Sequence, residues 1–332
     1  MASVGVVGAT SWGTTLAITV ARKGVDVCLL ARTDDEAEEL ERERENIRFL
    51  PGAKFPPSLH VDASRDRALA GVDIVIIAVP SRSMRENARA VRDFLPPSAV
   101  VVSATKGLER GSAKRMSQIL VEELPAGHHD RICALSGPNL AHEIVQGKPS
   151  TTVVASPNED AVKRAQSVLN SPSFRVYTNT DIVGVELGGA LKNIVALGAG
   201  MADGLEYGDN AKAAFITRGL AEIARLGVAA GAEPLTLAGL AGMGDLIATC
   251  SSPLSRNRRV GEELARGRSL GDILAGMKHV AEGVDTTAAA VGMADSLGVE
   301  MPIARAIYSV LFNGMAIPQA VSELMGRAPS PE

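Results

Sequence analysis

Lys192 is a candidate for moving a proton because of the segment in which it lies. It lies in the apolar, glycine-rich segment 186–198, whose one other charged residue is Glu186. A lysine in such surroundings is partly desolvated, which favours its neutral form and suits it to proton transfer at a substrate hydroxyl. The alternative is a lysine whose ammonium reaches solvent along a helix edge, and this segment alone favours neither interpretation.

A second set of chemically useful side chains follows in the turn-rich stretch 250–259. Arginine forks bind phosphate oxygens in pairs, and serine and asparagine add neutral donors. A solvated basic loop is the alternative, but the neighbouring glycine-dense segment 239–246, which carries Asp245, favours a binding site. The sequence therefore predicts a phosphate clamp among Ser255, Arg256, Asn257, Arg258 and Arg259.

Residues 8–13 read Gly-Ala-Thr-Ser-Trp-Gly between a strand pattern and a helix pattern. Gly8 suits a tight turn and Gly13 lets a helix pack closely on a strand, as in the turn that binds a dinucleotide pyrophosphate at a helix N-terminus. Thr10 stands at the usual middle glycine, so we expect its side chain to shift the cofactor or restrict the loop. The alternative is an ordinary glycine-rich turn.

Arg32 follows the second predicted strand, at the position that reads the ribose 2′ group. An acidic residue there holds the 2′-hydroxyl of NAD, whereas an arginine accommodates the 2′-phosphate of NADP. Arg32 therefore favours NADP, although Asp34 and Asp35 follow closely and weaken the preference. The alternative is a surface arginine at a strand end.

Two further turns carry polar residues just past predicted strands. Lys106 follows the run 100–103, and Gly137 and Asn139 follow the run 132–135. Ligands of open α/β sheets bind beyond the carboxyl ends of the strands. We therefore expect these residues to face the same crevice as the glycine turn.

The elements that must position these residues change type along the chain. Short β-branched runs alternate with helical patterns in the first half, which predicts a mostly parallel sheet in a Rossmann-type dinucleotide-binding domain over residues 1–182. The second half has helical spacing only, which predicts an all-helical substrate-binding domain over 183–332. The predicted strands are 4–7, 25–30, 74–79, 100–103, 132–135, 152–155 and 174–177, and the predicted helices are 211–231, 260–267, 269–277, 286–297 and 302–312.

Composition excludes several classes of protein. A net charge of −4 with no basic stripe argues against a nucleic-acid partner. The three cysteines are scattered and lack metal spacing, and no other cluster of metal ligands stands out, so we expect free thiols and no metal. We expect no signal peptide and no membrane insertion, because the longest apolar run is broken by Lys192 and Asn193.

Along nearly its whole length the chain resembles the bacterial NAD(P)-dependent glycerol-3-phosphate dehydrogenases. The segment from Gly239 is long and specific, and the order and spacing of the whole set make coincidence improbable. The matching segments are GATSWGTTLA from Gly8, NIRFLPG from Asn46, VPSRSMRE from Val79, ATKGLE from Ala104, SGPNLAHE from Ser136, LGGALKNIVALGAGMADGL from Leu187, GLAGMGDLIATCSSPLSRNRRVG from Gly239 and AEGVDTTAA from Ala281.

This resemblance implies a role for each matching position. Lys192 is then the proton acceptor in alcohol oxidation, and Lys106 touches both substrate and cofactor. The implied substrate-binding residues are Lys106, Gly137, Asn139, Lys192, Asp245, Ser255, Arg256 and Asn257. The implied contacts to NAD or NADP are made by Gly8, Ser11, Trp12, Gly13, Arg32, Phe49, Lys106, Ala141, Arg256, Val280 and Glu282.

The resemblance also implies an enzyme that interconverts glycerol 3-phosphate and dihydroxyacetone phosphate and feeds glycerophospholipid synthesis. The free thiols predict a cytoplasmic location, and the Ala- and Gly-rich helical half, which should leave apolar surface over, predicts a homodimer. The chain departs from the family at Thr10, at Asn139, where Ser or Thr is usual, and at Phe49, where Tyr or His is common. We expect these departures to tune cofactor preference or affinity. Two other interpretations stay open: a dehydrogenase of 3-hydroxy acids, and a non-catalytic dinucleotide sensor, which Thr10 alone favours.

Overall fold

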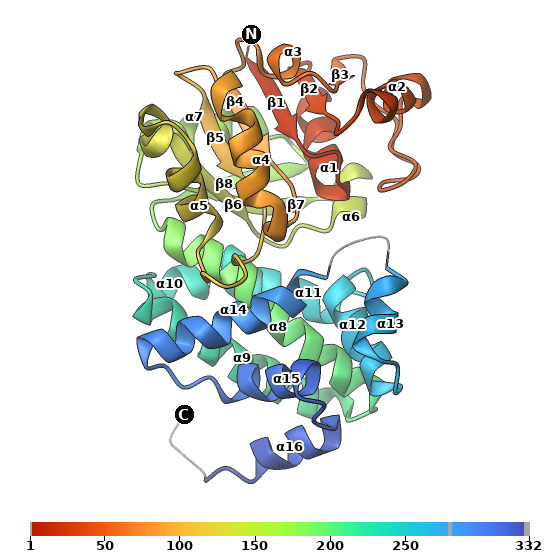
Figure 1. Cartoon of the computed structure of the whole chain (residues 1–332), viewed down its shortest axis with the longest axis vertical. Coiled ribbons are helices and arrows are strands. Elements are labelled where there is room, and N and C mark those ends of the chain that lie inside the picture. The colour runs from red at the N-terminus through yellow and green to blue at the C-terminus, as the bar shows by residue number, and fades with distance from the viewer. Residues whose placement is uncertain (1, 278–280, 329–332) are drawn as a thin grey trace. The chain divides into compact units, whose positions relative to one another are not determined.

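The computed structural model describes residues 2–277 and 281–328. The chain divides into two compact units, which Figure 1 shows in colours that follow the sequence. The first unit comprises Met1–Lys106 and Arg115–Glu186, and the second comprises Gly107–Lys114 and Leu187–Glu332. The division therefore falls inside helix α8 (Ile182–Gly204).

Within the described residues the first unit is built on an eight-stranded sheet in the order β3-β2-β1-β4-β5-β6-β7-β8. Neighbouring strands are parallel except for the β6–β7 pair, which is antiparallel. The strands are β1 (Ser3–Val7), β2 (Asp26–Leu30), β3 (Leu59–Asp62), β4 (Ile74–Ile77), β5 (Val100–Ser103), β6 (Ile132–Ser136), β7 (Ser150–Ala155) and β8 (Phe174–Asn179).

Helices cover both faces of this sheet. The central strand β4 is Ile-Val-Ile-Ile and wholly buried, as expected for a parallel strand with helices on each side. Leu16 of α1 and Leu169 of α7 belong to the core on one face, while Met84 of α4 and Leu120 of α5 belong to the core on the other. The predicted α/β class with a Rossmann-type sheet is confirmed.

The helices of the first unit connect its strands. They are α1 (Ser11–Ala21), α2 (Asp34–Glu43), α3 (Arg65–Leu69), α4 (Met84–Val91), α5 (Met116–Glu123), α6 (Ala141–Val145) and α7 (Glu159–Leu169), with short 3₁₀ segments η1 (Ser81–Ser83), η2 (Arg92–Phe94) and η3 (Ala126–Arg131).

In the described part of the second unit all regular structure is helical, as predicted. After α8 come α9 (Gly208–Ala229), α10 (Pro234–Leu237), the π-helical segment η4 (Leu240–Gly244), α11 (Asp245–Ser251), α12 (Arg256–Ala265), α13 (Leu270–Ala275), α14 (Glu282–Leu297), α15 (Pro302–Phe312) and α16 (Ile317–Met325).

Helix α8 is the longest element of the chain as described, with 23 residues. Contrary to the sequence-based expectation, it is long and apolar enough to span a membrane by length and composition. Of the apolar window in this helix, however, 89% is buried in the protein. Lys192 and Asn193 do not break the apolar run; they are buried within it.

The start of α8 is anchored in the first unit by two carboxylates. Asp181 accepts a hydrogen bond from the Gly184 backbone N–H at 2.7 Å and so caps the helix. Glu186 is buried and accepts from the Ser117 backbone N–H at 2.7 Å, from the Ser117 hydroxyl at 2.5 Å and from the Arg115 guanidinium at 2.6 Å. The helix that carries Lys192 therefore begins at a fixed place.

Candidate functional site

The turn at residues 8–13 requires glycine at both ends. Gly8 has φ +111°, and a Cβ there would lie 2.8 Å from the Ala78 carbonyl oxygen. A Cβ on Gly13 would lie 2.0 Å from the Gly8 carbonyl oxygen. The chain can therefore fold tightly from β1 into α1, and the first backbone N–H groups of a helix are the kind of donors that can bind an anion.

Thr10 replaces the middle glycine and takes part in this turn. It is the N-cap of α1, and its hydroxyl oxygen accepts from the Gly13 backbone N–H at 3.0 Å. The same hydroxyl donates to the carbonyl oxygen of Ala78, just after β4, at 2.8 Å. The side chain thus satisfies one of the N–H groups at the helix start and ties the turn to the neighbouring strand.

A buried asparagine joins the glycine turn to the loop that carries Phe49. The Asn46 amide nitrogen donates to the Ala9 carbonyl oxygen at 3.0 Å and to the Thr14 hydroxyl at 2.8 Å. Its amide oxygen accepts from the Phe49 backbone N–H at 3.2 Å. Sequence reasoning assigned Asn46 no role, although a polar residue in the motif NIRFLPG was a signal that it is needed.

Arg32 lies just beyond β2, as predicted, and is paired with Glu36 of α2. The Glu36 carboxylate accepts from the Arg32 guanidinium at 3.0 and 3.3 Å and from the Arg32 backbone N–H at 2.8 Å. Sequence reasoning did not consider Glu36, which lies four residues later in the chain.

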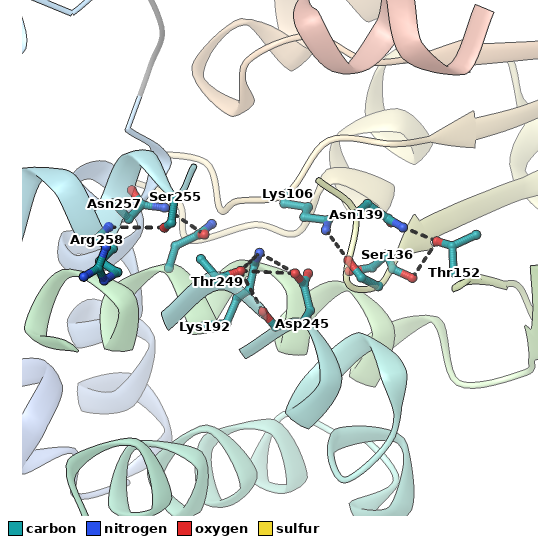
Figure 2. A network of polar contacts seen from close by, with 12 residues as sticks. Lys106, Ser136, Asn139, Thr152, Lys192, Asp245, Thr249, Ser255, Asn257 and Arg258 are labelled. Carbon is teal, nitrogen blue, oxygen red and sulfur yellow. Dashed lines mark hydrogen bonds and ion pairs between the residues drawn. The ribbon is translucent and has the colours of Figure 1, made fainter. Parts of the chain in front are cut away.

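The loops after β5 and β6 meet, as predicted. Lys106 follows β5, and its ammonium donates to the Gly137 carbonyl oxygen at 2.8 Å, in the turn after β6 (Figure 2). A Cβ on Gly137 would lie 3.0 Å from Cα of Thr152 in β7, so this turn packs directly on that strand. The first unit therefore brings Lys106, Gly137 and Asn139 together at one end of its sheet.

Asn139 holds the same turn to β7. Its amide nitrogen donates to the Thr151 carbonyl oxygen at 3.1 Å, and the Thr152 hydroxyl lies 3.0 Å from its amide oxygen. That hydroxyl also lies 3.0 Å from the Ser136 carbonyl oxygen (Figure 2). Asparagine at this position thus provides two contacts to β7, where a serine or threonine has only a hydroxyl.

The second unit contains a buried cluster around Lys192. The Lys192 ammonium lies 2.6 Å from Asp245 Oδ1 and 2.5 Å from the Thr249 hydroxyl oxygen (Figure 2). The Thr249 hydroxyl in turn donates to the Asp245 main-chain carbonyl oxygen at 2.6 Å. Lys192 is 6% exposed and Asp245 1%. Thr249 was missed from sequence; its spacing of four residues from Asp245 in α11 places the two side chains on one face of that helix.

Close helix packing explains why the segments around this cluster are rich in glycine. A Cβ on Gly188 of α8 would lie 2.8 Å from the Ala241 carbonyl oxygen and 3.0 Å from Cα of Gly242. The backbone of α8 therefore approaches η4 directly, and η4 leads into α11 at Asp245. This contact sets the spacing between Lys192 and Asp245.

The start of α12 is joined to the residue after Lys192. Ser255 caps α12 by accepting from the Arg258 backbone N–H at 3.2 Å. The Asn257 amide nitrogen donates to the Asn193 amide oxygen at 2.8 Å, and its oxygen accepts from the Gly283 backbone N–H at 3.0 Å. The N-terminus of this ten-residue helix is thereby fixed relative to α8 and α14, and it offers backbone N–H groups to an anion.

The arginines of the predicted phosphate clamp separate in the structure. Arg256 is exposed at the first position of α12. Arg258 instead donates to Asp203 Oδ2 at 2.7 Å and pairs with Glu262 at 2.9 Å, so it ties α12 to α8. Arg259 is exposed. Only Arg256 of the three stands at the capped helix end.

The remaining predicted contacts are partly exposed or lie outside the described residues. Val280 lies outside them. The partly exposed residues are Ser11, Trp12, Phe49, Ala141 and Glu282, of which Ala141 and Glu282 begin α6 and α14. Residues 2–277 and 281–328 contain no group of three or more His, Cys, Asp or Glu side chains that could hold a metal ion.

The Rossmann-type sheet, the glycine turn and the buried lysine cluster define a dinucleotide-dependent dehydrogenase. Residues 3–162 match the N-terminal model, and residues 181–322 the C-terminal model, of NAD-dependent glycerol-3-phosphate dehydrogenase. The chain belongs to this family.

Relatives match over nearly the full length of the chain. The chain is 54% identical over 326 residues to the glycerol-3-phosphate dehydrogenase [NAD(P)+] of Dehalococcoides mccartyi, covering 98% of this chain and 91% of the relative. It is 49% identical to the enzyme of Chlorobium limicola, covering 99% of each. The crystal structure of glycerol-3-phosphate dehydrogenase from Coxiella burnetii is similar with a TM-score of 0.93 and 36% identity, over 98% of this chain and 99% of that one.

Proposed function

We propose that this protein interconverts sn-glycerol 3-phosphate and dihydroxyacetone phosphate, with NAD or NADP as the hydride carrier. The observation that carries the proposal is the link between Lys192 and the start of α12. Asn193, the neighbour of Lys192, is hydrogen-bonded to Asn257, so one unit fixes a proton-handling ammonium and an anion-binding helix end relative to each other.

Lys192 gives a proton to the C2 oxygen when the ketone is reduced and takes it back when the alcohol is oxidised. Asp245 and Thr249 each accept a hydrogen bond from its ammonium, which holds Nζ in one place. Fixed geometry is what general acid–base catalysis needs, since transfer occurs only within hydrogen-bond reach.

The substrate phosphate is held at the start of α12. The helix N-terminus and the Arg256 guanidinium both favour a dianion, and Asn257 lies in the same turn. Binding energy from this remote group orients C2 for reaction. Lys106, whose ammonium is fixed on the Gly137 carbonyl oxygen, polarises the ketone oxygen.

The dinucleotide binds at the glycine turn of the first unit. The turn fits it, because Gly8 and Gly13 allow β1 to pass tightly into α1, although Thr10 already occupies the Gly13 N–H. When bound, the nicotinamide supplies or accepts the hydride. Ser11, Trp12, Arg32 and Phe49 would hold it, together with Ala141, Arg256, Val280 and Glu282.

Steady-state kinetics test this assignment. NADH or NADPH oxidation should be rapid with dihydroxyacetone phosphate and slow with small keto acids. Faster turnover of a keto acid would favour a hydroxy-acid dehydrogenase, and no turnover of any phosphorylated ketose would favour the dinucleotide sensor.

We also propose that the protein is a homodimer. A cavity of about 1200 Å³ lies among α8, α9, α15 and α16, lined by apolar side chains such as Phe215, Val310 and Leu324. Open apolar surface supports an interface between two copies, and symmetric pairs are the commonest assembly. Light scattering should give twice the mass of one chain, and Val228→Asp, at an exposed position lining this cavity, should shift the mass toward the monomer.

A cytoplasmic location agrees with the thiols. Cys28, Cys133 and Cys250 are unpaired, and burial raises the pKa of each to about 12, so none is a reactive thiolate. Free thiols are typical of reducing compartments. Fractionation of the source cells should recover the activity with cytoplasmic enzymes.

A further inference from the structure

The Glu36 carboxylate is the principal partner of Arg32. It accepts three N–H groups of that residue: the guanidinium at 3.0 and 3.3 Å and the backbone N–H at 2.8 Å. The Glu36 side chain is 18% exposed and that of Arg32 67%, so the carboxylate is the more enclosed member of the pair.

This pair lies where a dinucleotide-binding sheet distinguishes its two cofactors. Arg32 comes two residues after β2, and Glu36 lies in the first turn of α2. In such folds a carboxylate here accepts the ribose 2′-hydroxyl, whereas an arginine receives the 2′-phosphate. This chain has both charges at one place, and they are bonded to each other.

Glu36 is held as an anion. Burial raises its pKa, but the hydrogen bonds from Arg32 and the charges of Arg32 and Arg48 outweigh burial, and the pKa lies below its ordinary value. Arg48 is therefore a second cation near the same carboxylate; its guanidinium also lies over the Phe49 ring, 4.9 Å from the centroid.

The consequences for the two cofactors are opposite. A 2′-phosphate carries nearly two negative charges at neutral pH and needs the Arg32 fork, which Glu36 already occupies. It would have to displace the Glu36 carboxylate or lie beside a like charge. A 2′-hydroxyl is neutral and can donate to the carboxylate as it stands.

We propose that Glu36 is a specificity-determining residue that disfavours the 2′-phosphate, so that this chain uses NAD(H) more readily than Arg32 alone predicts. The proposal rests on the placement of the dinucleotide at the glycine turn. Removal of the Glu36 charge frees the Arg32 fork for the 2′-phosphate.

Binding of two fragments isolates the 2′ group without any need for turnover. Adenosine 2′,5′-bisphosphate and 5′-AMP differ only in the 2′-phosphate, and calorimetry gives the ratio of their affinities for the full chain. Glu36→Gln should raise this ratio in favour of the bisphosphate by about fivefold, and Arg32→Gln should lower it. The cap of α2 survives in Glu36→Gln, because Thr33 accepts from the backbone N–H of residue 36.

Glu38→Gln is the matched control, since it removes the same charge from an exposed position of the same helix. It should change the ratio much less than Glu36→Gln does. The preference of kcat/KM for NADPH over NADH should shift in the same direction in Glu36→Gln. An unchanged affinity ratio in Glu36→Gln, or an equal rise of this ratio in Glu38→Gln, overturns the proposed role of Glu36 but leaves the dinucleotide placement intact. Binding of neither nucleotide by the unaltered chain overturns the dinucleotide placement and this proposal with it.

Discussion

The ammonium of Lys192 and the carboxylate of Asp245 lie 2.6 Å apart, and both side chains are buried. Each has lost most of its hydration, so each depends on the other for compensation of its charge. Lys192 comes from the middle of α8, whereas Asp245 opens α11, 53 residues later in the chain. This contact is therefore both a structural element of the second unit and the centre of its proposed chemistry.

Replacement of Lys192 by alanine should remove the proton donor. We expect kcat to fall by about 10²- to 10⁴-fold, the range that a positioned acid–base group contributes. Dinucleotide binding should persist, because the glycine turn belongs to the first unit. Lys163→Ala, at an exposed position of α7, is the control and should keep full activity. An active Lys192→Ala enzyme would refute the role.

Asp245→Asn should destabilise the protein, because it leaves the Lys192 charge buried without its partner. The expected loss is about 3 kcal/mol in the free energy of unfolding. The double variant Lys192→Met/Asp245→Asn removes both charges and should recover most of that stability while staying inactive. Urea unfolding with a parallel activity assay separates the two effects. Equal stability of Asp245→Asn and the unaltered chain would show that the pair is not coupled.

The Thr10 hydroxyl should be needed for the stability of the glycine turn. Thr10→Val keeps the shape but leaves the Gly13 N–H without its cap, which should cost about 1 kcal/mol. Thermal unfolding should shift down by about 3 °C. Thr10→Ser keeps the hydroxyl and should melt like the unaltered chain. If the Thr10→Val and Thr10→Ser variants have the same melting temperature, the hydrogen bond from the Gly13 N–H to the Thr10 hydroxyl does not contribute to stability.

Glu222 should make stability depend on pH. This buried carboxyl accepts from the backbone N–H groups of Ile303 and Ala304, at 2.7 and 3.2 Å, and burial raises its pKa above the ordinary 4.5 despite those hydrogen bonds. As pH rises above 4.5, the unfolded chain releases this proton before the folded chain does. Stability is therefore lost as pH rises toward the folded-state pKa.

Glu222→Gln should remove this loss, because an amide oxygen accepts the same hydrogen bonds without a charge. Urea unfolding at a series of pH values from ~5 to ~8 measures the free energy of unfolding of the unaltered chain and of Glu222→Gln. The difference in unfolding free energy should grow with pH in favour of Glu222→Gln. A difference that stays constant across this range would contradict the raised pKa.

The fold class followed from hydrophobic patterns, but the predicted helices did not include the largely buried α8 or the short α10 and α11. All seven predicted strands are present, whereas β3 was missed. Only Leu59 and Val61 of this edge strand are buried, so its pattern is too short to detect. The nine-residue helix α16 was missed for a similar reason, because Ala320 is its one buried residue. A hydrophobic pattern reflects which side chains are buried, and β3 and α16 bury few of theirs.

The site followed from the motifs, but its supporting residues did not. Lys106 with Gly137, and Lys192 with Asp245, were predicted as site residues and are found in contact. Asn46, Asn193, Glu36 and Thr249 were assigned no role, because what each does depends on partners that only the folded chain supplies. The prediction was wrong in the opposite way for Arg258. It was assigned to the phosphate clamp because it is close to Arg256 in sequence, but in α12 its side chain donates to Asp203 instead.

The most direct test of the central claim is a comparison of dihydroxyacetone phosphate with dihydroxyacetone, which differ only in the phosphate. If Lys192 and the start of α12 act on one phosphorylated ketone, kcat/KM should be at least about 10³-fold higher for the phosphate ester, with glycerol 3-phosphate as the product. Comparable turnover of the two ketones, or none of either, would contradict the account.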